Sequence, residues 1–169
     1  VTHYTLFVIH HATRRIQIVG TTPNPGALFM SQAAKLLTDH IDGFLRSARY
    51  FIIDRDTKFT AAFRNILKGA GVLPIFIPRR APNCNGIAER FVGSINSECL
   101  SKIMFLGPGS LDRALREYAE HYNAERNHQG IENALIAPTD LVGTLEGRVV
   151  RRERLGGLLS FYHRRSAAA

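Results

Sequence analysis

Two carboxylates, Asp54 and Glu89, have sequence surroundings suited to metal-dependent chemistry. Asp54 ends the apolar, β-branched run 50–53, which predicts a strand. Glu89 follows the turn-rich stretch 82–86, where a helix is expected to begin and its dipole favours an ionised carboxylate. Mg²⁺ prefers carboxylate oxygens, and two such ions can drive phosphodiester cleavage. In a strongly basic chain, the pair predicts metal-dependent chemistry on a phosphodiester.

Taken singly, each acid also has an ordinary structural explanation. Asp54 suits a turn or a helix cap, and Glu89 suits the first turn of any helix. Asp56 is a further possible ligand, although a solvated loop acid is the simpler interpretation. His10 and His11 are adjacent, so on a strand they would point to opposite faces. A serine hydrolase and a P-loop nucleotide site are not supported, because neither motif occurs.

The charge of the chain favours a polyanion as partner. Its 169 residues, most simply one domain, carry a net charge of +8 with a pI near 10.1. The segment 147–169 contains six arginines and one acid, and so contributes +5 of that charge. This segment either binds phosphates or is a solvated, partly disordered tail. A merely basic protein is the alternative for the whole chain, and no membrane span is expected.

The pattern of apolar residues predicts an α/β layered domain. Strands are expected over 4–9, 14–19, 49–54 and 72–77, and helices over 26–40, 60–70 and 86–103 and from 111 onward. The apolar face of the first helix is expected to comprise Phe29, Ala33, Leu36, Leu37 and Ile41. The pattern weakens after residue 138, where residues 145–162 are expected to form a small appendage.

Three stretches carry a more specific resemblance. Asp54 is followed by Phe59 five positions later, and Glu89 lies 35 positions beyond Asp54 in the stretch Pro-x-x-Asn-Gly-x-x-Glu-Arg, 82–90. The third stretch is Tyr-Asn-x-x-Arg-x-His, 122–128, with Pro138 downstream. Over roughly residues 4–140 the chain resembles the catalytic core of retroviral-type integrases and of bacterial insertion-sequence transposases with an acidic triad.

The resemblance implies a ribonuclease H-like, three-layer fold with a mixed sheet, and Mg²⁺- or Mn²⁺-dependent cleavage and strand transfer of DNA. Asp54 and Glu89 would be the second and third catalytic, metal-binding acids. Residues 1–140 would form the core and 141–169 a basic tail. Expected partners are transposon-end and target DNA and further copies of the chain, in the bacterial cytoplasm at the nucleoid. Candidate nucleic-acid contacts are Lys58, Arg79, Arg80, Asn83, Arg90, Arg151, Arg152 and Arg154.

The family's first catalytic acid has no counterpart here. No aspartate or glutamate precedes Asp39, and the strands expected at 4–9 and 14–19 resemble the family's second and third. The first strand is therefore expected to be missing, and the sequence, which starts at Val1, to be incomplete at its N-terminus. We predict that the chain alone is inactive or nearly so. The alternatives are a non-catalytic DNA-binding remnant of a transposase, or a ribonuclease H-like nuclease that hydrolyses without joining.

Overall fold

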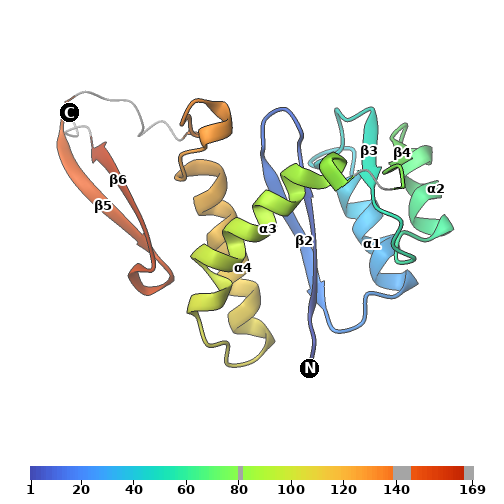
Figure 1. Cartoon of the computed structure of the whole chain (residues 1–169), viewed down its shortest axis with the longest axis horizontal. Coiled ribbons are helices and arrows are strands. Elements are labelled where there is room, and N and C mark those ends of the chain that lie inside the picture. The colour runs from blue at the N-terminus through green and yellow to red at the C-terminus, as the bar shows by residue number, and fades with distance from the viewer. Residues whose placement is uncertain (80–81, 139–145, 166–169) are drawn as a thin grey trace. The chain divides into compact units, whose positions relative to one another are not determined.

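A computed structural model describes residues 1–79, 82–138 and 146–165 (Figure 1). The chain divides into two compact units, each described here by itself. Unit 1 contains Val1–Val8 and Gln17–Gly86, and unit 2 contains Ile9–Ile16 and Ile87–Ala169. No helix within the described residues is long and apolar enough to cross a membrane.

The expected mixture of strands and helices is confirmed, but the strands form small separate sheets. β1 (Tyr4–Ile9) pairs with β2 (Ile16–Thr22). β3 (Tyr50–Ile53) and β4 (Leu73–Phe76) are parallel, and β5 (Arg148–Arg154) and β6 (Leu159–Arg165) are antiparallel. Across the described ranges each sheet has two strands, so no continuous mixed sheet forms.

Four α-helices and four short 3₁₀ helices complete the described structure. The α-helices are α1 (Ala27–Leu37), α2 (Ala61–Gly69), α3 (Gly86–Glu98) and α4 (Pro108–Ala124). The 3₁₀ helices are η1 (Pro82–Asn85), η2 (Leu100–Lys102), η3 (Gln129–Ile131) and η4 (Leu155–Gly157). α2 starts where sequence rules predict, because the Thr60 side chain caps it by accepting a hydrogen bond from the Phe63 N–H.

Unit 1 is held together by one apolar core on which both of its sheets pack. Its fully buried centre comes from α1 and α2, with Leu37, Phe63 and Leu67 among the most buried side chains. Val8 of β1 belongs to this core, and Phe51 of β3 packs against it. Since both sheets rest on the same helices, α1 and α2 cover one side of β1–β2 and of β3–β4.

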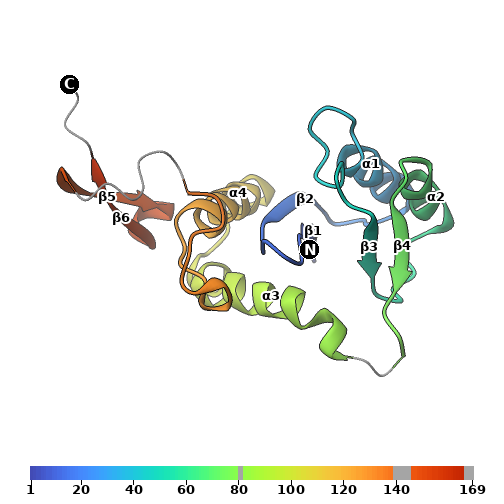
Figure 2. The same ribbon diagram turned by 90° about the horizontal axis from the view of Figure 1, so that it is seen from above.

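The other side of the β3–β4 sheet is apolar and uncovered in the described structure. The register pairs Tyr50 with Leu73 and Ile52 with Ile75, and all four side chains are about half exposed. In addition, neither β1 nor β3 pairs with a further described strand, so each keeps one unpaired backbone edge. Figure 2 shows the two sheets as separate ribbons.

Unit 2 is built around the contact of α3 with α4. Phe91 of α3 meets the rings of Tyr118 and Tyr122 of α4, at centroid distances of 6.3 and 5.0 Å. Ile95 and Cys99 are buried four and eight positions after Phe91. Leu115, Tyr118 and Tyr122 are buried and form the apolar stripe of α4.

The predicted inward face of α1 was partly wrong. Leu36 and Ile41 are 53% and 68% exposed, whereas Met30 and Ala34 are buried together with Leu37. The helix was expected to run to residue 40 but ends at Leu37. Ile41 therefore lies beyond the helix, where helical spacing no longer determines which side a residue faces.

Other element boundaries also differ from the prediction. β2 begins at Ile16 and runs to Thr22, because Arg14 has a left-handed backbone (φ 66°) in a turn closed by its N–H to the His10 carbonyl. α3 ends at Glu98 instead of residue 103, because the next backbone, at φ −132° and ψ −69°, leaves helical values.

The described part of the C-terminal segment is a structured hairpin. Residues 148–165 form the β5–β6 hairpin, turned by η4. Gly156 and Gly157 have positive φ values of 67° and 91°, which glycine adopts without steric cost. This Gly-Gly pair is a turn signal within residues 145–162, which were expected to form a small appendage.

The burial pattern of α1 yields a test with an internal control. Leu37→Ala removes a fully buried side chain and should lower the free energy of unfolding by about 3–5 kcal/mol. Leu36→Ala, on the neighbouring but exposed position, should cost less than about 1 kcal/mol. Urea denaturation of both variants measures the difference. Equal losses would contradict the described inward face of α1.

Candidate functional site

Asp54 lies immediately after β3, exposed, at the carboxyl end of the strand. Its Oδ1 accepts the Asp56 N–H at 2.9 Å, which folds the next residues into a tight turn. Asp56 in turn accepts the Lys58 N–H at 2.9 Å and the Lys58 ammonium at 2.7 Å. The hydrogen bonds from Lys58 lower the pKa of Asp56. This carboxylate therefore already binds groups of its own loop.

The loop that follows β3 therefore presents Asp54 beside a half-exposed lysine. The Lys58 ammonium also lies 5.4 Å from the centre of the Tyr4 ring, which fixes the long side chain between two partners. The hydrogen bond from Lys58 to Asp56 raises the pKa of Lys58. Lys58 thus remains a cation next to Asp54, as a phosphate contact requires.

Glu89 lies in the first turn of α3 and is exposed. The predicted helix start is confirmed, and η1 leads directly into it. Arg90 and Arg79 are exposed near the two ends of this connection, and Asn83 lies within η1. Arg80, also predicted to contact nucleic acid, lies outside the described residues. Asp54 belongs to unit 1 and Glu89 to unit 2, so each acid is described in its own unit.

No metal centre of three protein ligands is formed by the described residues. No three His, Cys, Asp or Glu side chains lie close enough there to hold one ion. The oxygen donors suit Mg²⁺ in chemical type, but two carboxylates are few for a pair of divalent ions.

The stretch 122–128, the third stretch that carries the predicted resemblance, has a structural role. The Asn123 side chain accepts the Ile16 N–H and donates to the Ile16 carbonyl, both at 2.9 Å. This amide thus satisfies both backbone groups of Ile16 at the start of β2, as a neighbouring strand would. His128 is buried, with Nε2 at 2.7 Å from the Tyr122 carbonyl and its ring against Tyr122.

Arg126 of the same stretch joins the end of α4 to the end of α3. Its guanidinium binds Glu98 through Nε and Nη2, at distances down to 2.7 Å. The buried Tyr118 hydroxyl donates to the same carboxylate at 2.9 Å. Burial would raise the pKa of Glu98, but the hydrogen bonds from Arg126 and Tyr118 lower it. Glu98 is therefore a charged anchor within unit 2.

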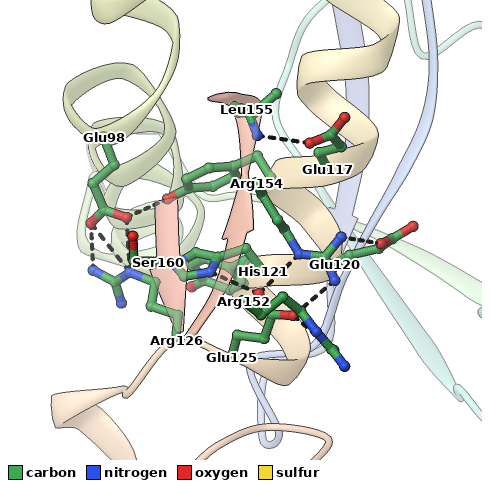
Figure 3. Close-up of polar contacts among 12 residues, drawn as sticks. Glu98, Glu117, Glu120, His121, Glu125, Arg126, Arg152, Arg154, Leu155 and Ser160 are labelled. Carbon is green, nitrogen blue, oxygen red and sulfur yellow. Dashed lines mark hydrogen bonds and ion pairs between the residues drawn. The ribbon is translucent and has the colours of Figure 1, made fainter. Parts of the chain in front are cut away.

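A larger ionic cluster joins α4 to the hairpin (Figure 3). Glu125 is almost fully buried, and Arg154 binds both of its oxygens at 2.8 and 2.9 Å. Arg152 reaches Glu125 at 3.3 Å, and His121 Nδ1 lies 3.2 Å from it. Arg154 also pairs with the more exposed Glu120 at 2.5 Å. The hairpin arginines that were expected to meet DNA are thus partly committed to carboxylates of α4.

The electrostatics of Glu125 follow from these contacts. Burial alone would raise the pKa of the Glu125 carboxyl, but hydrogen bonds from Arg154 and His121 lower it to about 2. The same contacts raise the pKa of Arg154. Both groups remain charged at neutral pH. Separating Glu125 from Arg154 would leave a buried charge without its partner and would cost folding free energy. The cluster therefore holds the hairpin against α4.

The acids of this cluster were not predicted as important residues. Glu117, His121 and Glu125 are four positions apart and so share one face of α4. Glu117 also accepts the Leu155 N–H at 2.9 Å, at the turn of the hairpin. The detectable signal was this polar stripe beside the apolar one, followed downstream by an arginine-rich segment.

Residues 70–135 match the family described as integrase core domain. This segment is similar to the integrase core family. The match includes Glu89, Glu98 and the stretch 122–128, but it begins after Asp54. The predicted family resemblance is confirmed for the integrase core segment, and it indicates a function related to transposition or integration. No curated protein matches the chain.

Within the integrase core segment, the polar residues Glu89, Glu98, Arg126 and His128 divide into two groups by burial. Glu89 is exposed, as a residue that acts on a substrate must be. Glu98, Arg126 and His128 instead satisfy one another or nearby backbone, which stabilises the contact of α3 with α4. The resemblance of the sequence in 122–128 therefore reflects the scaffold.

The Glu125 cluster predicts unequal costs for two acids that share a partner. Glu125→Gln removes a buried charge and leaves Arg154 without its main partner, so unfolding should require about 3 kcal/mol less. Glu120→Gln, on a 64% exposed side chain, should cost less than about 1 kcal/mol. Thermal and urea denaturation measure both. A similar cost for the two variants would refute an anchoring role of Glu125.

Acid should weaken the same cluster. The pKa of Glu125 in the folded chain is about 2, below the ordinary value of 4.5, so the folded state favours the charged form. Its stabilisation is complete above about pH 4.5 and is lost as the pH falls toward 2. Urea midpoints measured at intervals between these values should fall less steeply for Glu125→Gln than for the parent. Parallel slopes would contradict this assignment.

Proposed function

We propose that this chain serves DNA transposition or integration, as part of a polynucleotidyl transferase that cleaves and joins phosphodiester bonds. The integrase core match over 70–135 carries the proposal, because it contains Glu89 in its predicted sequence context. Asp54 lies outside the match. It is included in the proposal because of its sequence motif and because it is exposed at the end of a parallel strand. In this proposal the two acids are the second and third members of the catalytic set.

We further propose a ribonuclease H-like fold that lacks one strand. The β1–β2 and β3–β4 sheets rest on the same helices, as two parts of one larger sheet would. β1 and β3 each have an edge that no described strand fills. The resemblance places the first strand, with the first acid, at the centre of the sheet. Its absence from the described structure offers a reason for two small sheets in place of one.

The proposed metal is Mg²⁺ or Mn²⁺, held by Asp54 and Glu89. When bound, such an ion would polarise the phosphate and activate the attacking oxygen. Both carboxylates are exposed, and Lys58 beside Asp54 would offset phosphate charge. Two acids make an incomplete site, so the chain would need a further acid from another segment or polypeptide to be active.

DNA is the proposed substrate and partner, bound by a chain of net charge +8. The proposed DNA contacts are Lys58, Arg79, Arg80, Asn83 and Arg90. Assembly with further copies of the chain also belongs to the proposal, because cutting and joining involve two DNA ends and a target.

A second candidate function is a DNA-binding remnant without catalysis. The small number of acids favours it, because the described residues offer no group of three metal-ligating side chains. The two candidates share DNA as ligand and differ in whether Asp54 and Glu89 bind one ion together.

Calorimetric titration with Mn²⁺ distinguishes the two. We expect weak binding by the parent, abolished in both Asp54→Asn and Glu89→Gln, because each variant removes one of two ligands. Asp42→Asn, which removes an exposed acid elsewhere in unit 1, is the matched control and should bind as the parent does. The same samples should show no Mn²⁺-dependent joining of DNA. Binding that neither variant disturbs would favour the remnant, and robust joining would refute the need for a further acid.

A further inference from the structure

The two faces of the β5–β6 hairpin differ in burial. Side chains alternate along each strand, so the register assigns every residue to one face. The face against α4, here the inner face, includes Val150, Arg152, Arg154, Leu159, Phe161 and His163, all buried or half-buried. The exposed Arg148, paired with Arg165, continues this face at the open end of the hairpin. The opposite face, here the outer face, comprises Val149, Arg151, Glu153, Ser160, Tyr162 and Arg164.

The positive charge of Arg152 and Arg154 on the inner face is already neutralised. Arg154 and Arg152 pair with Glu125, and Arg154 also pairs with Glu120. Two arginines thus face two carboxylates, one of them buried. A phosphate would have to displace these carboxylates to bind here, and doing so would leave Glu125 buried without a partner.

The outer face combines cationic and aromatic side chains on an exposed ribbon. Arg151 and Arg164 lie on opposite strands, and Tyr162 lies directly across from Arg151. Tyr162 is 63% exposed, and the Arg151 guanidinium is 6.0 Å from the centre of its ring. Arg151 also contacts Glu153 and Ser160, while Arg164 donates to the Gly147 carbonyl. These contacts hold both guanidinium groups on the surface without burying them.

We propose that the outer face of the hairpin binds the phosphate backbone of DNA through Arg151 and Arg164, with Tyr162 packed against the same strand. The proposal rests on the proposed function for its ligand. It assigns Arg164 and Tyr162 to a site, and it makes Arg152 and Arg154 structural residues.

Geometry and charge favour a nucleic acid as the occupant. Side chains diagonally placed on paired strands are about 7–8 Å apart, a separation similar to that of successive phosphates along one DNA strand. A two-stranded ribbon fits a DNA groove, and arginine binds phosphate through two parallel N–H groups. An exposed tyrosine beside arginines is a common surface for nucleic acid, because rings stack on bases and sugars. Glu153 is the single acid of the outer face, so the face is cationic.

The test is the salt dependence of duplex DNA binding, measured by fluorescence anisotropy on the full chain. Each lost phosphate contact lowers the slope of log K against log salt by about 0.9, so Arg151→Ala with Arg164→Ala should lower it by nearly 2. For the parent, the affinity falls by some factor when salt rises from about 50 to about 200 mM. In the double variant this factor should be roughly ten times smaller. Tyr162→Ser should weaken binding at an unchanged slope. The melting temperature should stay near that of the parent for all three substitutions.

Three further variants make the result decisive. Arg46→Ala with Arg116→Ala removes the same charge from exposed sites elsewhere and should lower the slope clearly less. Arg151→Lys with Arg164→Lys keeps the charge and should retain the slope. Arg154→Ala should lower the melting temperature instead. Suppose that the parent binds DNA. The inference is then overturned if the Arg151→Ala/Arg164→Ala variant keeps the parent's slope, or if its slope equals that of the Arg46→Ala/Arg116→Ala control. A parent that binds no DNA would refute the proposed function as well.

Discussion

A buried carboxylate must be paired with positive charge. In unit 2 this carboxylate is Glu125. Its burial on α4 would be prohibitive without Arg154, which binds both oxygens, and without Arg152 and His121 around it. The strands that carry these arginines are consequently held against the helix. A segment whose composition suggested a solvated tail becomes a structured part of the unit because of this one charge.

The same principle separates scaffold from candidate chemistry elsewhere. Glu98 is partly buried and accepts hydrogen bonds from Arg126 and Tyr118, so its role is to stabilise the fold. Asp54 and Glu89 are exposed, at a strand end and a helix start respectively. Acids that stabilise the protein are those enclosed by arginine, and the acids proposed for catalysis are those that face solvent.

Much of the fold was predictable from local patterns. The apolar runs predicted β1 and β3, and helical spacing predicted the existence of α1, α2 and α3. Local patterns failed where an element ended early, as in α1. Leu36 and Leu37 are equally apolar, and only tertiary packing determines that Leu37 is buried and Leu36 exposed. The pairing of Glu125 with Arg154 spans 29 positions and depends on how the hairpin packs, which no short window of sequence contains. The candidate acids, in contrast, were found by their motifs, whose spacing does not require knowledge of packing.

The open edges of β1 and β3 have a consequence for the behaviour of the chain in concentrated solution. Unpaired backbone N–H and C=O groups along a strand are a template on which another strand can add. The β3 edge belongs to the sheet that carries the apolar strip of Tyr50, Ile52, Leu73 and Ile75. This strip contains none of the lysines or prolines that usually discourage such pairing. Self-association and demand for chaperones are therefore expected to accompany high expression of this chain, and unit 1 would be their origin.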